Sequence, residues 1–215
     1  MSRFEQIKLD WSLYAILDKK FVGSRNLKSL TEQVITGGAG IIQLRNKLSS
    51  SGEFYADALE VKKITTHFGI PLIINDRVDI ALAIKAEGVH IGQDDLPFAF
   101  ARRLIGKEMM LGASVHSLEE YQTALAGQPD YLGVGTIYPS PTKSALKKKG
   151  LELIKELRRV TTLPMVGIGG VTVDNAAAVI QAGANGVAVI SGLFDTDDVI
   201  GRAREFITRI KNSHS

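Results

Sequence analysis

Residues 72–114 read LIINDRVDIALAIKAEGVHIGQDDLPFAFARRLIGKEMMLGAS. The stretch contains three short apolar runs, and two longer runs with apolar residues at helical spacing lie between them. Strands that are short and almost continuously apolar are buried on both faces, as in a parallel sheet whose connections are helices. The stretch therefore predicts a chain built from repeated strand–helix units.

The same alternation extends outward in both directions. Strands are expected at Leu13–Leu17, Ile41–Leu44, Leu72–Ile74, Val89–Ile91, Met110–Ala113, Tyr131–Val134, Met165–Ile168 and Val187–Ile190. Helical patterns follow at 27–35, Phe54–Phe68, Val78–Ala86, Phe98–Ile105, Leu118–Leu125, Leu151–Val160, Ala176–Ala182 and Val199–Ile210. Eight units with short connections favour a closed (β/α)₈ TIM barrel of the α/β class over a doubly wound sheet.

One domain should span residues 1–215, with the barrel proper at about 13–210 and a lead-in helix within 1–12. The run Ser117-Leu-Glu-Glu120 has the form of a capping box at a helix start. Six glycines lie where helices are expected to end: Gly37, Gly69, Gly88, Gly106, Gly127 and Gly183.

The composition excludes several classes of function. The chain has no cysteine, which rules out disulfides, thiolate metal sites and cysteine nucleophiles. A formal charge of +3, without a basic stripe interleaved with aromatic residues, gives no reason to expect a nucleic-acid partner. No run approaches the ~18 apolar residues of a membrane span, and the charged N-terminus MSRFEQIKLDW does not resemble a signal peptide. A cytoplasmic enzyme is expected.

Barrel enzymes carry their chemistry at the carboxyl ends of the strands, and polar residues collect there in this sequence. The second strand ends in Gln43-Leu-Arg45-Asn-Lys47. Strand alternation places Gln43, Arg45 and Lys47 on one face, where two cations and an amide could clamp a diphosphate. The alternative is a solvated strand end, but polar residues at the neighbouring strand ends favour the clamp.

Carboxylates follow the next two strands. Asp76 lies in Asn75-Asp76-Arg77 after the third strand, and Asp95 ends the run Gly92-Gln-Asp94-Asp95 after the fourth. Either could simply cap a helix. Because neighbouring strands deliver both to the same rim, we expect Asp76 and Asp95 to hold Mg²⁺ together with substrate phosphates, and Asp94 to be the candidate cap.

The fifth strand ends in Gly112-Ala-Ser114-Val-His116. Ser114 could donate to a phosphate or to a ring nitrogen. His116 is either an acid–base group or a polar residue at a helix entry. His90, within the fourth strand, fits a buried and hydrogen-bonded histidine better than a reactive one.

The longest loop follows the sixth strand and contains Ser140, Thr142 and Lys143 between and after two prolines. A long loop at this face of a barrel is commonly a lid. Its hydrophilic character favours Lys143 as a diphosphate partner over a Schiff-base lysine, which needs a desolvated site.

Glycine and serine close the last two strand ends. Gly169-Gly170 follows the seventh strand, and Ile190-Ser191-Gly192 follows the eighth. Backbone amides beside such glycines can approach a phosphate closely, and barrels often bind phosphate at these two loops. One phosphate cradle and one cationic clamp imply two phosphorylated partners. No clear Ser-His-Asp set is present, and metal-assisted departure of a diphosphate needs none.

Taken together, these motifs resemble the thiamine phosphate synthase family over roughly residues 13–210. The resemblance is carried by Gln43-Leu-Arg45-Asn-Lys47, Asn75-Asp76-Arg77, Gly88-Val-His-Ile-Gly-Gln-Asp-Asp95, Gly112-Ala-Ser114, Gly133-Val-Gly-Thr-Ile-Tyr-Pro-Ser-Pro-Thr-Lys143 and Val166-Gly-Ile-Gly-Gly170. It implies condensation of 4-amino-5-hydroxymethyl-2-methylpyrimidine diphosphate with a phosphorylated thiazole, or its carboxylate. Diphosphate leaves first, and the thiazole nitrogen captures the pyrimidine carbocation.

The resemblance also assigns roles. The pyrimidine diphosphate would be bound by Gln43, Arg45, Lys47, Asn75, Ser114 and Lys143, among which Arg45, Ser114 and Lys143 would be catalytic. Mg²⁺ would be held by Asp76 and Asp95. The thiazole phosphate would be bound by Ser140, Thr142, Gly170, Ile190 and Ser191. The family usually has proline at the position of Thr136 and threonine at that of Ser140, which keeps the hydroxyl.

Three alternatives remain at this point. A thiazole tautomerase on the same barrel carries the pattern Ser114-Val-His116-Ser-Leu-Glu-Glu120 with the histidine as acid–base catalyst, but typically lacks the acidic pair and the full clamp. A phosphate-sugar epimerase or aldolase leaves the clamp without a purpose. A non-catalytic binder of thiamine precursors gains little from a metal site. The sequence leaves open whether the chain forms a homo-oligomer.

Overall fold

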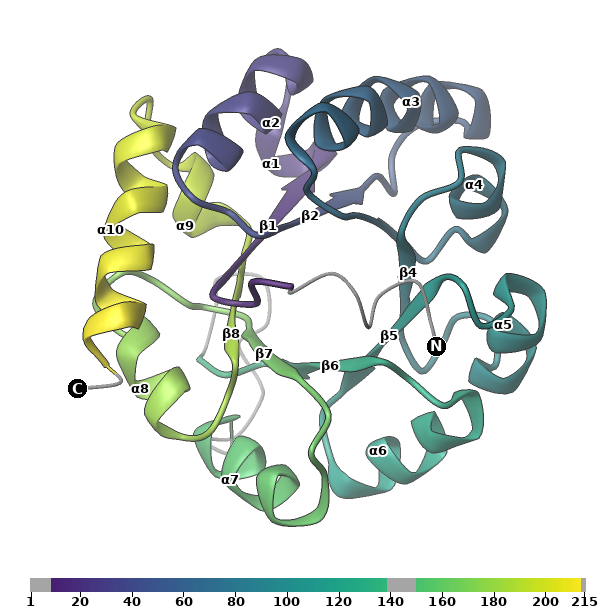
Figure 1. Ribbon diagram of the computed structural model, residues 1–215, viewed down its shortest axis with the longest axis vertical. Helices are drawn as coiled ribbons and strands as arrows, with labels where there is room; N and C mark the ends of the chain where they lie inside the picture. Colours follow the sequence, from purple (N-terminus) through teal and green to yellow (C-terminus); the bar gives the residue numbers. More distant parts are fainter. Residues whose placement is uncertain (1–8, 139–149, 214–215) are drawn as a thin grey trace.

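The computed structural model describes residues 9–138 and 150–213. Eight parallel strands, hydrogen-bonded in chain order, close into a barrel. They are β1 (Leu13–Asp18), β2 (Ile41–Arg45), β3 (Leu72–Asn75), β4 (Gly88–Ile91), β5 (Met110–Val115), β6 (Tyr131–Gly135), β7 (Met165–Ile168) and β8 (Gly186–Val189). Figure 1 shows the strands as an inner ring and the helices as an outer ring. The predicted TIM barrel is confirmed, and each strand lies within two residues of its expected bounds.

The helices of the outer ring are α1 (Lys19–Val22), α2 (Leu27–Thr36), α3 (Ser51–Phe68), α4 (Val78–Ala83), α5 (Phe98–Ile105), α6 (Leu118–Ala124) with the 3₁₀ turn η1 (Leu125–Gly127), α7 (Gly150–Val160), α8 (Ala176–Gln181), α9 (Ser191–Phe194) and α10 (Val199–Asn212). The four-residue helices α1 and α9 were not predicted, because one turn is too short to show helical periodicity. None of the helices described has both the length and the apolar character needed to span a membrane.

Three local predictions were wrong. Gly88 begins β4 instead of ending a helix. Ser117 caps α6 as expected, but the Glu120 carboxylate accepts from the amide of His116 instead of closing the box. Within the predicted lead-in helix, residues 9–12 are not helical, and residues 1–8 lie outside the described part. A complete capping box occurs instead at Ser50 and Glu53, where α3 begins.

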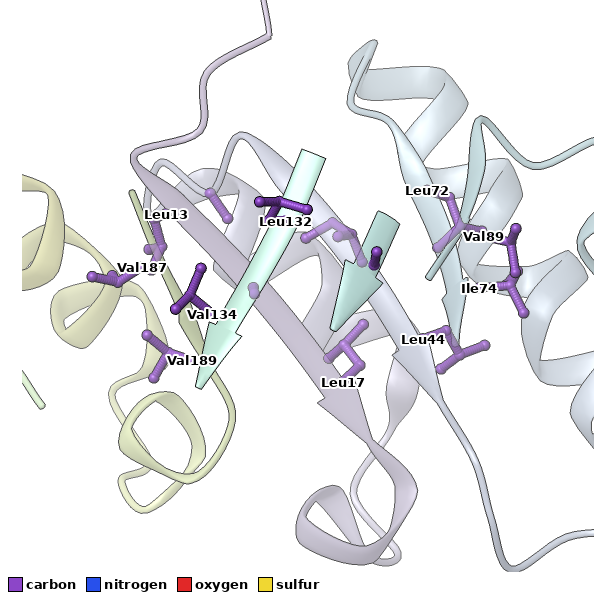
Figure 2. Packing of buried hydrophobic residues seen from close by; sticks show 14 of the residues in the cluster. Leu13, Leu17, Leu44, Leu72, Ile74, Val89, Leu132, Val134, Val187 and Val189 are labelled. Carbon is purple, nitrogen blue, oxygen red and sulfur yellow. The ribbon is translucent and has the colours of Figure 1, made fainter. Parts of the chain in front are cut away.

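Strand alternation divides the buried side chains into two cores. On β1, Leu13, Ala15 and Leu17 point outward into the layer between strands and helices, and Figure 2 shows Leu13 and Leu17 in this layer beside residues of the neighbouring strands. Tyr14 and Ile16 point into the barrel and belong to a separate inner core. Burial of one such aliphatic side chain contributes about 1.5–3 kcal/mol, so the outer core supplies most of the hydrophobic stabilisation.

The inner core fills the amino end of the barrel. Trp11, in the lead-in to β1, lies with its ring 4.9 Å from that of Tyr131. In Figure 1 this lead-in, in purple, crosses the middle of the ring of strands. The inner core is completed by other inward-facing residues, among them Tyr14, Ile41 and Ile73. Polar inward positions are thereby confined to the carboxyl end of the barrel, where the strands open to solvent.

Glycines on β5 and β6 give the inner core its room. A Cβ at Gly112 would lie 2.3 Å from Cζ of Tyr131 and 2.4 Å from Nδ1 of His90. A Cβ at Gly133 would lie 2.9 Å from Cε1 of His90. Such contacts are impossible without displacement, so these glycines are required for space rather than for backbone conformation, and they fix the positions of His90 and Tyr131 inside the barrel.

Candidate active site

A cavity of about 710 Å³ opens at the carboxyl end of the barrel. Its wall follows the inward register of the strands, from Tyr14 and Ile16 on β1 to Ala188 and Ile190 at the end of β8. Among the residues predicted for the site, those that line it are Gln43, Arg45, Lys47, Asn75, Asp76, Asp95, Ser114 and Ile190. The strand alternation that placed Gln43, Arg45 and Lys47 on one face is confirmed.

Two cationic side chains of the wall, those of Arg45 and Lys47, already contact carboxylates. Arg45 forms an ion pair with Asp18, which is 2% exposed at the end of β1. Nζ of Lys47 lies 2.8 Å from Oδ2 of Asp76. Asp18 was not predicted, although it occupies the inward register of β1 after Tyr14 and Ile16, so alternation alone could have found it.

Asp76 and Asp95 face each other across the rim between β3 and β4. Burial raises the pKa of Asp95, the Gly92 amide lowers it, and the charge of Asp76 together with a hydrogen bond to it raises it further. That amide lies 2.7 Å from Oδ2 of Asp95. Two carboxylates this close repel each other unless a proton or a cation lies between them.

Helix capping does not explain these aspartates. The N-cap of α4 is Arg77 and that of α5 is Pro97, neither with a side-chain cap hydrogen bond. The alternative role for Asp76 and Asp95, and the capping role predicted for Asp94, are therefore both wrong. Asp76 has φ 62°, a left-handed conformation in which Asp and Asn are tolerated better than other side chains. This backbone turn carries its carboxylate toward Asp95.

Charge in the described part of the wall is unbalanced. It holds three cations, Lys20, Arg45 and Lys47, but five carboxylates: Asp18, Asp76, Asp94, Asp95 and Glu120. A diphosphate would meet net negative charge there. The donor set of the Asp76–Asp95 pair, two hard oxygen ligands with room for phosphate oxygens, fits Mg²⁺. In residues 9–138 and 150–213, no group of three or more His, Cys, Asp or Glu side chains could hold a metal.

A buried chain of hydrogen bonds crosses the floor of the cavity. Nε2 of Gln43 donates to Oη of Tyr14 at 2.7 Å, and the two tyrosine hydroxyls of Tyr14 and Tyr131 are 2.8 Å apart. Oη of Tyr131 lies 3.0 Å from Nδ1 of His90, whose Nε2 lies 2.8 Å from Oγ of Ser114. His90 is thus the buried, hydrogen-bonded histidine that was expected. Tyr14 and Tyr131 were not predicted, since their side chains lie below the rim.

Burial controls the charge state of this chain. It lowers the pKa of His90 from 6.5 to about 4, with Asp95 opposing the shift, so the imidazole is neutral at pH 7. It also raises the pKa of both Tyr14 and Tyr131 above the ordinary value of a phenol. The chain therefore consists of neutral groups, each with a fixed number of hydrogens to donate.

The wall after β7 and β8 differs in part from the prediction. Gly169 and Ile190 line the cavity, whereas Gly170 and Ser191 are not among the lining residues described. The Gly170 carbonyl accepts from Nδ2 of Asn175, and Ser191 begins α9. Gly169 and Gly170 have φ 95° and 64°, values that glycine adopts without the steric cost that other residues meet.

The loop after β6 is described only at its beginning. Thr136 lines the cavity. The amides of Ile137 and Tyr138 donate to the carbonyls of Ile168 and Gly169, which attaches the start of the loop to β7. The candidate residues Ser140, Thr142 and Lys143 lie outside the described residues.

His116 also reaches the cavity. Its Nδ1 lies 2.8 Å from Oε2 of Glu120, and both residues line the wall. A carboxylate that accepts from one imidazole nitrogen orients the ring and leaves the other nitrogen available. This arrangement suits either an acid–base group or a residue that holds the entry of α6.

Comparison with known proteins identifies relatives over nearly the whole chain. The model of the thiamine monophosphate synthase family matches residues 13–193. Thiamine-phosphate synthase of Clostridium acetobutylicum is 44% identical over 205 residues, 95% of this chain and 97% of that protein. The enzyme of the same name from Chloroflexus aurantiacus is 44% identical over 92% of this chain and 91% of its own. In structure, thiamine phosphate pyrophosphorylase from Pyrococcus furiosus superposes with a TM-score of 0.86 at 31% identity, covering 96% of this chain and 98% of its own.

Proposed function

Because the chain belongs to the thiamine monophosphate synthase family, we propose how its described residues divide the work of the transfer. The protein is a transferase that makes thiamine phosphate. The substrates proposed are 4-amino-5-hydroxymethyl-2-methylpyrimidine diphosphate and 4-methyl-5-(2-phosphoethyl)thiazole or its carboxylate. The observation that carries the assignment of the site is the pairing of Asp76 with Asp95 on the rim that also holds Arg45 and Lys47.

The diphosphate end of the first substrate belongs at this rim. Arg45 can exchange its ion pair with Asp18 for phosphate oxygens, and Lys47 can do the same with Asp76. Asp76 and Asp95 would hold Mg²⁺, which when bound supplies the positive charge that the described wall lacks and stabilises the departing diphosphate. Lys143, from the loop after β6, would add a further cation on the same leaving group.

The pyrimidine ring belongs deeper in the barrel. Gln43 and Ser114 lie on β2 and β5, at the two ends of the buried hydrogen-bond chain, and Asn75 ends β3 between them. These polar groups can orient the ring so that its exocyclic carbon faces the opening. The carbon–oxygen bond breaks with its electron pair leaving on the diphosphate, and the thiazole nitrogen donates its lone pair to the resulting carbocation.

The thiazole phosphate is assigned to the β7–β8 side. Ile190 and Gly169 line the cavity on this side and offer an apolar contact and a backbone amide, and Gly170, also proposed for this phosphate, follows directly in the chain. Ser140, Thr142 and Ser191 would complete the phosphate site. This orientation brings the thiazole ring over the cavity from the side opposite Asp76 and Asp95, so that the nitrogen and the leaving group are on opposite faces of the reacting carbon.

A direct assay tests the proposal. Purified protein is incubated with both substrates, with MgCl₂ or with EDTA, and thiamine phosphate and pyrophosphate are quantified by chromatography. Equal amounts of both products, formed only with Mg²⁺, are expected. Product formation that is unaffected by EDTA would refute the metal assignment. Isomerisation of the thiazole carboxylate without condensation would instead identify the His116–Glu120 pair as the working centre.

A further inference from the structure

The hydrogen bonds on the floor of the cavity form one uninterrupted chain from β2 to β5. It runs Gln43, Tyr14, Tyr131, His90, Ser114, with every step between 2.7 and 3.0 Å. Its two ends, Gln43 and Ser114, line the cavity, whereas Tyr131 is 0% exposed. The chain therefore connects two groups of the ligand site through the interior of the barrel.

Counting hydrogens gives the chain a direction. Nε2 of Gln43 can only donate, so Oη of Tyr14 is the acceptor of that hydrogen bond. The Tyr14 hydroxyl can then donate its own hydrogen to Oη of Tyr131. The Tyr131 hydroxyl donates its hydrogen in turn to Nδ1 of His90. If Tyr131 donated to Tyr14 instead, the Tyr14 hydroxyl would accept from both Gln43 and Tyr131. Its own hydrogen would then have no acceptor among the contacts described for residues 9–138 and 150–213.

The direction decides how Ser114 meets a ligand. A neutral imidazole whose Nδ1 accepts carries its hydrogen on Nε2, and this hydrogen is donated to Oγ of Ser114. The serine oxygen is then already engaged as an acceptor of the imidazole hydrogen. Its own hydrogen is left to point toward the cavity.

We propose that Tyr14, Tyr131 and His90 are positioning residues that transmit the donor direction of Gln43 across the barrel and hold Ser114 as a hydrogen-bond donor before the substrate arrives. Ser114 is thereby selective for an acceptor atom of the ligand, such as a ring nitrogen or a phosphate oxygen, over a donor. The inference deepens the proposed function, because it rests on Ser114 facing the pyrimidine diphosphate.

The surroundings keep the chain in this state. Gly112 and Gly133 provide the space that Tyr131 and His90 occupy. A Cβ at either glycine would displace one or both of these rings. The two ring nitrogens of His90 face the hydroxyls of Tyr131 and Ser114, so a nitrogen that accepts from Tyr131 leaves the imidazole with one ring hydrogen, on the side of Ser114. In a buried environment, an unmade hydrogen bond is costly, which penalises a break anywhere along the chain.

The tautomer of His90 tests the direction in the free protein. The chain is labelled with [¹⁵N]histidine, and long-range ¹H–¹⁵N spectra at pH 7.5 distinguish a protonated ring nitrogen from a bare one. The His90→Gln variant identifies the His90 signals among the four histidines. The hydrogen is expected on Nε2. A hydrogen on Nδ1, or a mixture of the two tautomers, would overturn the proposal.

A double-mutant cycle tests transmission. Gln43→Glu replaces the donor with an acceptor of the same shape, and we expect it to shift the His90 ring nitrogens toward the Nδ1–H form. The same substitution in a Tyr131→Phe or Tyr14→Phe background, where the chain is cut, should leave them unmoved. A response to Gln43→Glu of the same size in the intact and the cut backgrounds would show that the chain transmits nothing.

Kinetics link the tautomer to the ligand. Tyr131→Phe should raise KM for the pyrimidine diphosphate about three- to ten-fold, the value of one directed hydrogen bond, with a smaller change in kcat. Tyr55→Phe is the matched control, because Tyr55 is 38% exposed on α3 and lies outside the cavity. An unchanged KM in Tyr131→Phe would refute the role of the chain in binding. If the wild-type chain made no thiamine phosphate, the proposed function would fail, while the tautomer measurements would still decide the direction of the chain.

Discussion

Replacement of Asp76 by Asn separates the catalytic role of the acidic pair from its structural role. Asn has the shape of Asp and tolerates the φ of 62° found at this position, whereas Ala would add about 1 kcal/mol of backbone strain. The substitution removes one of the two carboxylates proposed to hold Mg²⁺ and leaves the cavity wall otherwise intact.

The expected effects on stability and on turnover differ widely. The Lys47–Asp76 ion pair has side chains that are 54% and 20% exposed, so its loss costs at most about 1 kcal/mol. Removal of the repulsion on Asp95 partly offsets this. The melting temperature should therefore fall by no more than about 4 °C. Loss of one group that stabilises the departing charge should lower kcat by about 10²–10³, or roughly 3–4 kcal/mol.

Asp79→Asn is the matched control. Asp79 lies in the first turn of α4, three residues further along, and its carboxylate lies 2.8 Å from Nε of Arg77, outside the cavity wall described. The Asp79→Asn variant loses one negative charge and one exposed ion pair, as Asp76→Asn does, and we expect it to keep full activity. Rates of thiamine phosphate formation are measured from 0.05 to 20 mM MgCl₂ (roughly the range for weak sites), alongside thermal unfolding. Wild-type kcat and Mg²⁺ dependence in Asp76→Asn, or an equal loss of activity in Asp79→Asn, would refute the metal assignment.

Three further changes test other parts of the structure. Arg45→Lys should raise KM for the pyrimidine diphosphate about tenfold, because an ammonium cannot make the two parallel contacts of a guanidinium; unchanged KM would exclude Arg45 from the clamp. Burial lowers the pKa of His90 from 6.5 to about 4, so the free energy of unfolding is highest above pH 6.5 and falls as the pH is lowered toward 4. Urea unfolding should show a loss of about 2 kcal/mol in this free energy between pH 7 and pH 5, and the His90→Gln variant should lack it. Equal pH dependence in both proteins would contradict the burial argument. Gly112→Ala should cost about 1–3 kcal/mol of unfolding free energy, since its Cβ would lie 2.3 Å from Tyr131, whereas Gly52→Ala, with nothing within 4 Å, should cost none; similar values for the two would show that the barrel interior yields easily.

The strands were predictable because their signal is local. An apolar run flanked by polar residues is buried whichever neighbours it acquires, so all eight strands were located within two residues. Alternation along β2 also fixed which of its side chains point inward. Short helices such as α1 and α9, and the partner of Glu120, depend on contacts that no periodicity encodes.

The rim of the candidate site was predictable for the same reason, and its floor was not. Asp76 directly follows β3, and Asp95 lies in the short loop after β4, so the sequence brought them to one rim once a barrel was inferred. Asp18 is the last residue of β1 and lies on the same rim, but it stands alone in the sequence, without a motif around it. Tyr14 and Tyr131 are separated by 117 residues along the chain, and only closure of the barrel brings their hydroxyls within 2.8 Å.

The sequence by itself determined the architecture, the inward face of β2 and the family, because these depend on residue types at short spacing. The tertiary structure decided which charges meet, that Asp76 and Asp95 lie together instead of capping helices, and that five side chains from five strands share one line of hydrogen bonds. Hydrogen bonds and ion pairs act over about 3 Å, and contacts of that length between distant residues exist only after the strands have taken their register around the barrel.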